Sequence, residues 1–130
     1  MRDAAMDVAV LGAGTAGAVA ALLLARAGCA VTLYERRAAP PPFKIGEGLP
    51  PTIHPLLARL RLLDHVRRGP HTPAYANRSA WGSDAVRDDD FIRHPHGHGF
   101  HLDRVAFDAM LLSLAVRAGA RIERPAHVAG

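Results

Sequence analysis

Four residues near the N-terminus have the types and the spacing of a dinucleotide site. Gly12, Gly14 and Gly17 form the pattern G-x-G-x-x-G, and the acid Glu35 follows 18 residues after the last glycine. In such a turn the first glycine permits a tight bend, the second lets a pyrophosphate approach the backbone, and the third lets helix and strand pack closely. A carboxylate at this distance accepts hydrogen bonds from an adenosine ribose.

The segments around the glycines are those that such a site requires. Positions 8–11 form a short apolar run typical of a strand buried on both faces, and positions 16–27 are rich in the helix formers Ala and Leu. Gly28 supplies a helix stop, and the β-branched and aromatic run 30–34 predicts a second strand. Strand, glycine turn, helix and strand make a βαβ unit. We therefore predict an α/β fold, Rossmann-like, with a parallel sheet.

The helix that follows the turn is expected to bind the phosphates, because its N-terminus offers N–H groups and the positive end of the helix dipole. Glu35 favours a free ribose 2′-hydroxyl, as in NAD or FAD, because an acid there would repel a 2′-phosphate. Arg36 is expected along the adenine face, with a solvated loop arginine as the alternative. The cofactor contacts predicted in this part of the chain are Gly12, Ala13, Gly14, Thr15, Ala16, Gly17, Glu35 and Arg36.

The uncharged run 8–25 has a second interpretation, as a membrane or secretion segment. Three observations argue against this interpretation. The run contains glycines, and its apolar pattern changes from that of a strand to that of a helix. The start "MRDAAMD" before it has one Arg against two Asp. The net charge of +4 comes from scattered arginines without interleaved aromatic residues, which does not support nucleic-acid binding. The single cysteine, Cys29, excludes an intrachain disulfide and fits a reducing compartment. We therefore expect a cytoplasmic protein without nucleic-acid or membrane partners.

The histidine-rich stretch 94–101 invites a metal interpretation, because His94, His96, His98 and His101 nearly alternate. The interspersed Pro95, Gly97 and Gly99 predict an irregular loop instead, so we predict no metal site. A loop lining a substrate entrance and a plain surface loop both remain open. Before it, positions 79–83 and 91–93 are predicted as two strands joined by the acidic turn 88–90. The sequence identifies no catalytic residue.

Two further segments carry a family resemblance. The loop after Glu35 leads to Gly46-Glu47-Gly48 and two prolines, and then to a helix predicted from Pro55 with leucines 56, 57, 60 and 63 on its apolar stripe. The stretch 99–120, "GFHLDRVAFDAMLLSLAVRAGA", has an Arg followed by Phe-Asp and a Leu-rich helix with Asp103 as its N-cap. With the βαβ unit, these segments resemble the N-terminal part of the FAD-dependent monooxygenase and flavin-dependent tryptophan halogenase superfamily, whose FAD domain has the glutathione-reductase-type Rossmann fold.

The resemblance implies FAD as the cofactor. It places Arg104 near the phosphate and ribityl chain, and Lys44 and Glu47 near the flavin. It implies an oxidoreductase that acts through reduced flavin and O2 on a small molecule or an aromatic side chain, with NAD(P)H or a flavin reductase as electron source. Residues 70–102 are expected to form a substrate-side insertion.

Two features of these relatives, a later Gly-Asp motif and a substrate domain, do not occur in the sequence. Residues 1–130 are therefore expected to be an incomplete FAD-binding domain that alone binds FAD weakly and catalyses nothing. The alternatives are an NAD-linked Rossmann oxidoreductase and a non-catalytic dinucleotide-binding module.

Overall fold

The computed structural model describes residues 6–129, which fall into two compact units. The first unit consists of the chain up to Phe43 together with the chain from Val105 onward. The second unit is Lys44–Arg104. Within residues 6–129, every helix is too short or too polar to cross a lipid bilayer.

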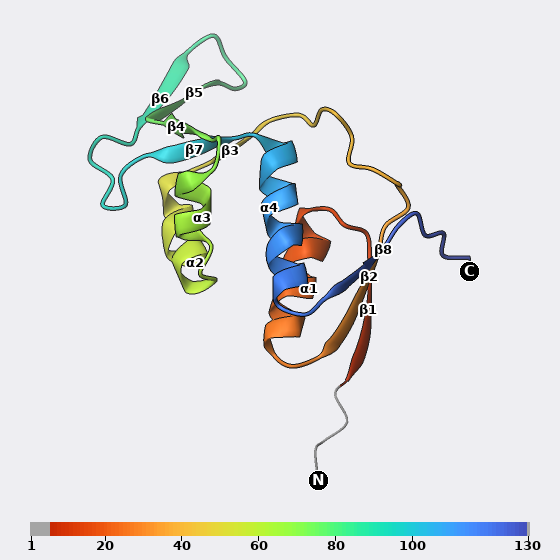
Figure 1. Cartoon of the computed structure of the whole chain (residues 1–130). Helices are drawn as coiled ribbons and strands as arrows, with labels where there is room; N and C mark the ends of the chain where they lie inside the picture. The colour runs from red at the N-terminus through yellow and green to blue at the C-terminus, as the bar shows by residue number, and fades with distance from the viewer. Residues whose placement is uncertain (1–5, 130) are drawn as a thin grey trace. The chain divides into compact units, whose positions relative to one another are not determined.

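The first unit is built on a parallel sheet in the order β1 (Asp7–Leu11), β2 (Ala30–Tyr34) and β8 (Arg121–Glu123). Helix α1 (Thr15–Arg26) connects β1 to β2, helix α4 (Arg104–Arg117) precedes β8, and both helices lie on one face of the sheet (Figure 1). Right-handed crossovers between neighbouring parallel strands place both helices on that face. The predicted α/β fold with a parallel sheet is confirmed.

The core of this unit lies between the two helices and β2. Small side chains let α1 pack closely, since Ala18 and Ala21 are fully buried beside Leu22. Glycines end both helices in the left-handed conformation, with φ of +90° at Gly28, where the sequence predicts a helix stop, and +110° at Gly119.

The second unit contains an antiparallel sheet in the order β3 (Glu47–Leu49), β7 (Gly99–Leu102) and β4 (Thr72–Ala74). A 3₁₀ turn η1 (Pro51–Ile53) and helices α2 (His54–Arg59) and α3 (Leu63–Arg68) pack against one side of this sheet (Figure 1). Its core side chains include Leu57, Leu62, Val66, Phe100 and Leu102. Gly99 begins β7, so the irregular loop predicted through Gly99 ends one residue earlier.

The predicted helix from Pro55 through Leu63 is wrong in extent. Helix α2 ends at Arg59, and Arg61 adopts a left-handed φ of +58°, which an α-helix does not accommodate. The expected apolar stripe is therefore divided: Leu56 is 49% exposed and Leu57 is buried, and Leu62, which is not one of the predicted stripe residues, is buried as well. The break lets α3 turn back so that Val66 enters the same core.

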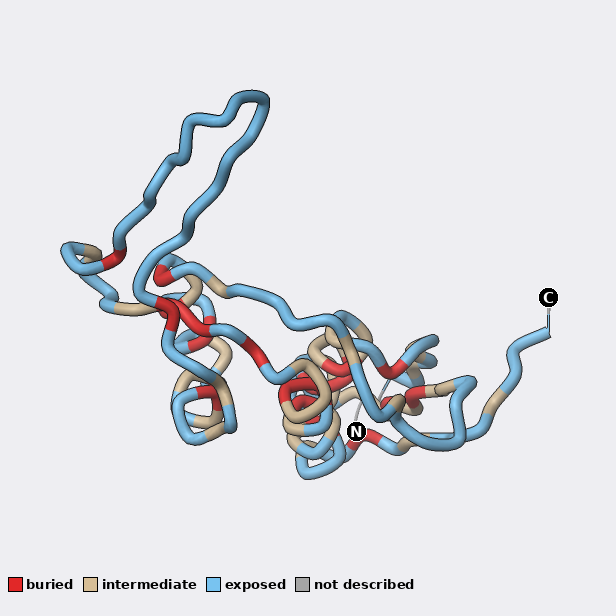
Figure 2. The backbone as a smooth tube through the Cα atoms, turned by 90° about the horizontal axis from the view of Figure 1, so that it is seen from above, coloured by how far each residue is buried: buried red, intermediate tan, exposed pale blue. Residues whose placement is uncertain are grey.

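The predicted acidic turn is also wrong. Residues 88–90 lie inside β6 (Val86–Asp90), which pairs antiparallel with β5 (Ala76–Ala80), whereas positions 91–93 form no strand. The turn lies at 81–85, where Gly82 has a φ of +76°. Asp88 belongs in the strand because its carboxylate faces Arg78, whose Nε donates to it over 2.6 Å. Figure 2 shows that this hairpin is exposed along both strands.

A buried histidine stands in the core of the second unit. His54 is 5% exposed, its Nε2 donates to the carbonyl oxygen of His98 at 2.9 Å, and its ring stacks on Phe100 with 5.2 Å between centroids. Burial lowers the pKa of His54, and the positive charge of Arg67 and the nearby His98 and His96 lower it further. The hydrogen bond to His98 acts in the opposite direction, but burial is the larger cause. His54 is therefore mainly neutral in the fold at pH 7.

We expect this unit to lose stability on mild acidification. The pKa of His54 is lower in the fold than its ordinary value of 6.5, so its stabilising contribution is full above about that pH and is lost as the pH falls toward the folded pKa. His71 is half-buried, and this burial also lowers its pKa, so His71 acts in the same direction. Urea unfolding at pH 7.5 and 5.5 measures the loss, at most about 1.4 kcal/mol per pH unit for each histidine.

His54→Phe should flatten this pH dependence, because phenylalanine keeps the ring stack without a titrating group. The matched control is His101→Gln, which alters an exposed histidine of the same unit. An equal flattening in both variants would contradict the assignment to His54.

Candidate dinucleotide-binding site

The glycine turn joins the end of β1 to the start of α1. The N–H of Gly12 donates to the carbonyl oxygen of Tyr34 over 2.8 Å, and Gly12 has a φ of +98° that glycine adopts without strain. A Cβ added at Gly17 would overlap the carbonyl oxygen of Gly12. The turn therefore depends on glycine at position 12 for conformation and at position 17 for the close approach of helix and strand.

The N-terminus of α1 is open to an anion. Gly14 is the N-cap, in an extended conformation and without a side-chain capping bond, and the first turn contains no acid. The intrahelical ladder begins with the N–H of Ala18, which donates to the carbonyl oxygen of Gly14 over 2.9 Å. A Cβ built on Gly14 meets no atom within 4 Å, so there is room above this backbone. Helix ends of this kind bind phosphates.

Glu35 is joined directly to this turn. Its Oε2 accepts the N–H of Ala13 at 2.8 Å, and its Oε1 accepts the N–H of Arg37 at 2.9 Å. These two hydrogen bonds, that of Arg37 first, lower the pKa of Glu35, and the charges of Arg37 and Arg124 lower it further. The carboxylate is therefore ionised at neutral pH, and its other lone pairs are suited to accept the hydroxyls of a ribose.

Two residues that sequence reasoning missed stand beside this turn. Asp108 of α4 is 3% exposed and accepts a hydrogen bond from the hydroxyl of Thr15 over 2.5 Å. Arg124 follows β8 closely enough to lower the pKa of Glu35. A signal for Asp108 exists in the sequence, because positions 108, 111 and 115 share one helix face with apolar residues at the other two. No comparable pattern points to Arg124.

The remaining predicted cofactor residues lie in the second unit. Glu47 and Arg104 form an ion pair there, in which the Glu47 side chain is 56% and the Arg104 side chain 22% exposed. Lys44 is half-buried in the same unit. The structure thus brings together Glu35 with Ala13 and Glu47 with Arg104, while Arg36 is an exposed residue of the first unit. The role of each of these residues toward a cofactor stays a prediction.

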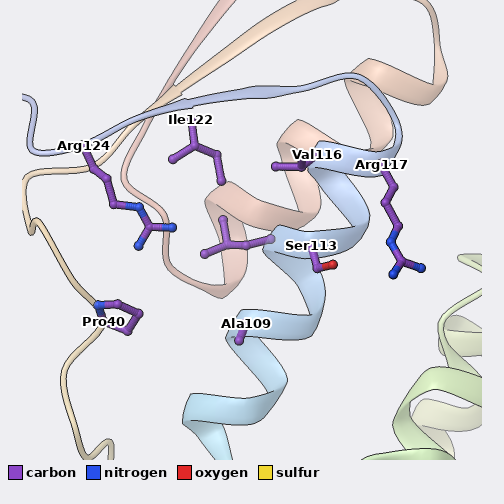
Figure 3. A pocket seen from close by; sticks show the side chains of 8 residues that line it. Pro40, Ala109, Ser113, Val116, Arg117, Ile122 and Arg124 are labelled. Atoms are coloured by element: carbon purple, nitrogen blue, oxygen red, sulfur yellow. The ribbon is translucent and has the colours of Figure 1, made fainter.

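The first unit also contains a groove of about 430 Å³ that is lined by residues of α4, the β8 segment and the loop at Pro40 (Figure 3). Its apolar lining includes Leu112, Val116 and Ile122, and the arginines 117 and 124 are also among the lining residues. None of the predicted cofactor residues lines it. We therefore place the candidate site at the glycine turn. Among the described residues, no three His, Cys, Asp or Glu side chains gather where they could hold a metal ion.

Similarity to known proteins agrees with this geometry. Digeranylgeranylglycerophospholipid reductase 2 of Methanopyrus kandleri is 35% identical over 122 residues, which are 93% of this chain and 28% of the reductase. Tryptophan 2-halogenase of Chondromyces crocatus is 32% identical over 115 residues, which are 88% of this chain and 22% of the halogenase. The chain thus spans less than a third of the length of either relative.

Solved structures are similar to this chain over nearly its full length. The structure of the myxobacterial chondrochloren halogenase CndH, an FAD-dependent halogenase, is 32% identical with a TM-score of 0.78. The match covers 95% of this chain and 29% of that chain. A p-nitrophenol monooxygenase structure shares the fold at 19% identity. Residues 5–130 match the family of the FAD binding domain, and the predicted cofactor, FAD, is thereby confirmed. The chain therefore belongs to the FAD binding domain family.

Proposed function

We propose that the turn Gly12–Gly17 and Glu35 hold the ADP half of FAD, in a flavin-dependent oxidoreductase of the monooxygenase or halogenase type. The observation that carries this proposal is the hydrogen bond between Glu35 and the N–H of Ala13. It fixes a ribose-binding carboxylate next to an uncapped helix N-terminus, and the two features together match the two polar parts of ADP.

Each part of the site has a distinct task in this proposal. The backbone from Ala13 to Gly17 and the dipole of α1 bind the pyrophosphate, with Gly14 allowing its close approach. Glu35 accepts the ribose hydroxyls, and exposed Arg36 lies along the adenine ring. Bound FAD supplies the redox chemistry, with NAD(P)H or a flavin reductase as electron source and with O2 and a small-molecule or aromatic side-chain substrate as reactants.

Residues of the second unit are proposed to serve the flavin and the substrate. Glu47 holds the Arg104 guanidinium in place, and we assign this ordered side chain to the phosphate and ribityl chain. Lys44 is assigned to the flavin side of the same segment. Residues 70–102, which include the exposed hairpin, are assigned to the substrate side. The relatives carry several times the length of this chain, so we assign catalysis to a protein with those further parts.

Titration of the purified chain with FAD, FMN, ADP and NADH tests the binding proposal. FMN has no ADP half, so we expect FAD to bind at least about tenfold more tightly than FMN, a difference of 1.4 kcal/mol. ADP should compete with FAD. NADH shares the ADP half but lacks the ribityl flavin that we assign to Lys44 and Arg104, so it should bind more weakly than FAD. Equal affinity for FAD and FMN would exclude the ADP-binding role of the turn. A preference for NADH would instead favour an NAD-linked oxidoreductase.

A further inference from the structure

A buried acid of α4 contacts the first residue of the phosphate-binding helix. Asp108 is 3% exposed, and its Oδ1 accepts a hydrogen bond from Thr15 Oγ1 over 2.5 Å. Thr15 directly follows the N-cap, Gly14, so this bond acts on the turn whose amides face the proposed pyrophosphate. The flanking core residues of α4, Phe107 and Leu111, are apolar and buried.

The energetics of this contact indicate a specific role. Burying a carboxylate is unfavourable unless hydrogen bonds replace its water, and a hydroxyl at 2.5 Å gives a short, charge-assisted bond. A negative charge near a helix N-terminus also competes with the phosphate for the dipole. Asp108 therefore does not improve phosphate binding through its charge. Its contribution is geometric, because Gly14 has no side chain with which to fix the first turn.

We propose that Asp108 is a positioning residue that holds the first turn of α1, through Thr15, in the geometry that binds the FAD pyrophosphate. The inference rests on the proposed binding of FAD at this turn. It adds a connection between two elements far apart in sequence: the helix that begins the βαβ unit is oriented by the helix that leads to β8.

The test compares a Thr15 variant that lacks the hydroxyl group with one that keeps it. Thr15→Val keeps the shape and removes the donor, so we expect FAD to bind about tenfold more weakly, the size expected for one hydrogen bond. Thr15→Ser restores the donor and should bind FAD as the wild type does. Asp108→Ala should weaken FAD binding similarly. The double variant Thr15→Val/Asp108→Ala should be no weaker than Asp108→Ala, because both changes remove the same bond. Ser113→Ala, at an exposed position of α4, is the matched control.

A second measurement needs no cofactor. The N–H of Ala18 closes the first turn by donating to Gly14, so its hydrogen exchange in the ligand-free protein reports the order of this turn. Thr15→Val should speed this exchange, and Thr15→Ser should not. Unchanged exchange in Thr15→Val, or additive losses in the double variant, would overturn the positioning role. If the wild type does not bind FAD but Thr15→Val still speeds the exchange of the Ala18 N–H, the proposed function alone is overturned.

Discussion

Replacing Gly17 with alanine is expected to destabilise the first unit by about 2–4 kcal/mol and to abolish FAD binding as a consequence. The added methyl would overlap the carbonyl oxygen of Gly12 and lie 3.1 Å from its carbonyl carbon. Both atoms belong to a tight backbone turn that cannot rotate away as a side chain would. Because whole domains are stable by only about 5–15 kcal/mol, such a loss is large. Thermal unfolding by circular dichroism measures it.

Gly14→Ala is the matched control, because it places the same methyl group three residues earlier in the same turn. Gly14 has a φ of −76°, which alanine adopts readily, and a Cβ there meets no atom within 4 Å. We expect an unchanged melting temperature but FAD binding weakened at least about tenfold, because the methyl occupies the path of the pyrophosphate. A Gly17→Ala variant that melts like the wild type would refute the packing argument. Full FAD affinity in Gly14→Ala would place the pyrophosphate elsewhere.

The first unit was predictable because its signals are local. The run of glycines at 12, 14 and 17, the helix stop at Gly28 and the β-branched strand before Glu35 each act within a few residues. Predicted and observed boundaries of this βαβ unit agree within one residue for α1 and β1, and β2 is the same. Local propensity and fold coincide here, so pattern reasoning was sufficient.

The second unit was poorly predicted because its structure depends on contacts distant in sequence. The leucines from 56 to 63 have helical spacing, but the left-handed Arg61 divides them between two helices. Three consecutive aspartates have the composition of a turn, yet Asp88 lies in a strand opposite Arg78. The local composition of a segment does not reveal which residue will lie opposite it on a neighbouring strand.

In the candidate site, too, local features were predictable and contacts between distant residues were not. The motif predicted which residues surround the turn, but not that Glu35 would accept the N–H of Ala13 or that Asp108 would accept the hydroxyl of Thr15. The Thr15–Asp108 contact joins residues 93 positions apart, and only the packing of α4 beside α1 creates it. A buried acid on an apolar helix face is the one signal by which sequence reasoning could have found Asp108.

Glu35→Gln is expected to weaken FAD binding by about 10- to 100-fold, which corresponds to the loss of a charged acceptor of hydrogen bonds. The amide keeps the size of the side chain, but it presents an NH2 group to one of its two present donors, the N–H groups of Ala13 and Arg37. The variant therefore loses both a ribose acceptor and part of the connection to the glycine turn. Glu123→Gln is the control, since it changes an exposed acid of the neighbouring strand. FAD titration followed by flavin fluorescence compares the two.

Over the pH range in which Glu35 stays ionised, comparison of the wild type with Glu35→Gln separates the charge of Glu35 from its shape. The pKa of Glu35 lies below its ordinary value of 4.5, so the ionised form and its stabilising contribution are complete above about that pH and are lost as the pH falls through the folded pKa. Wild-type affinity should therefore be constant from pH 8 to pH 6 as far as Glu35 is concerned. Glu35→Gln should be weak throughout this range. A variant that matched the wild type at pH 8 would show that the carboxylate charge is not what binds the ribose, and the role of Glu35 would then be limited to its bonds with the N–H groups of Ala13 and Arg37.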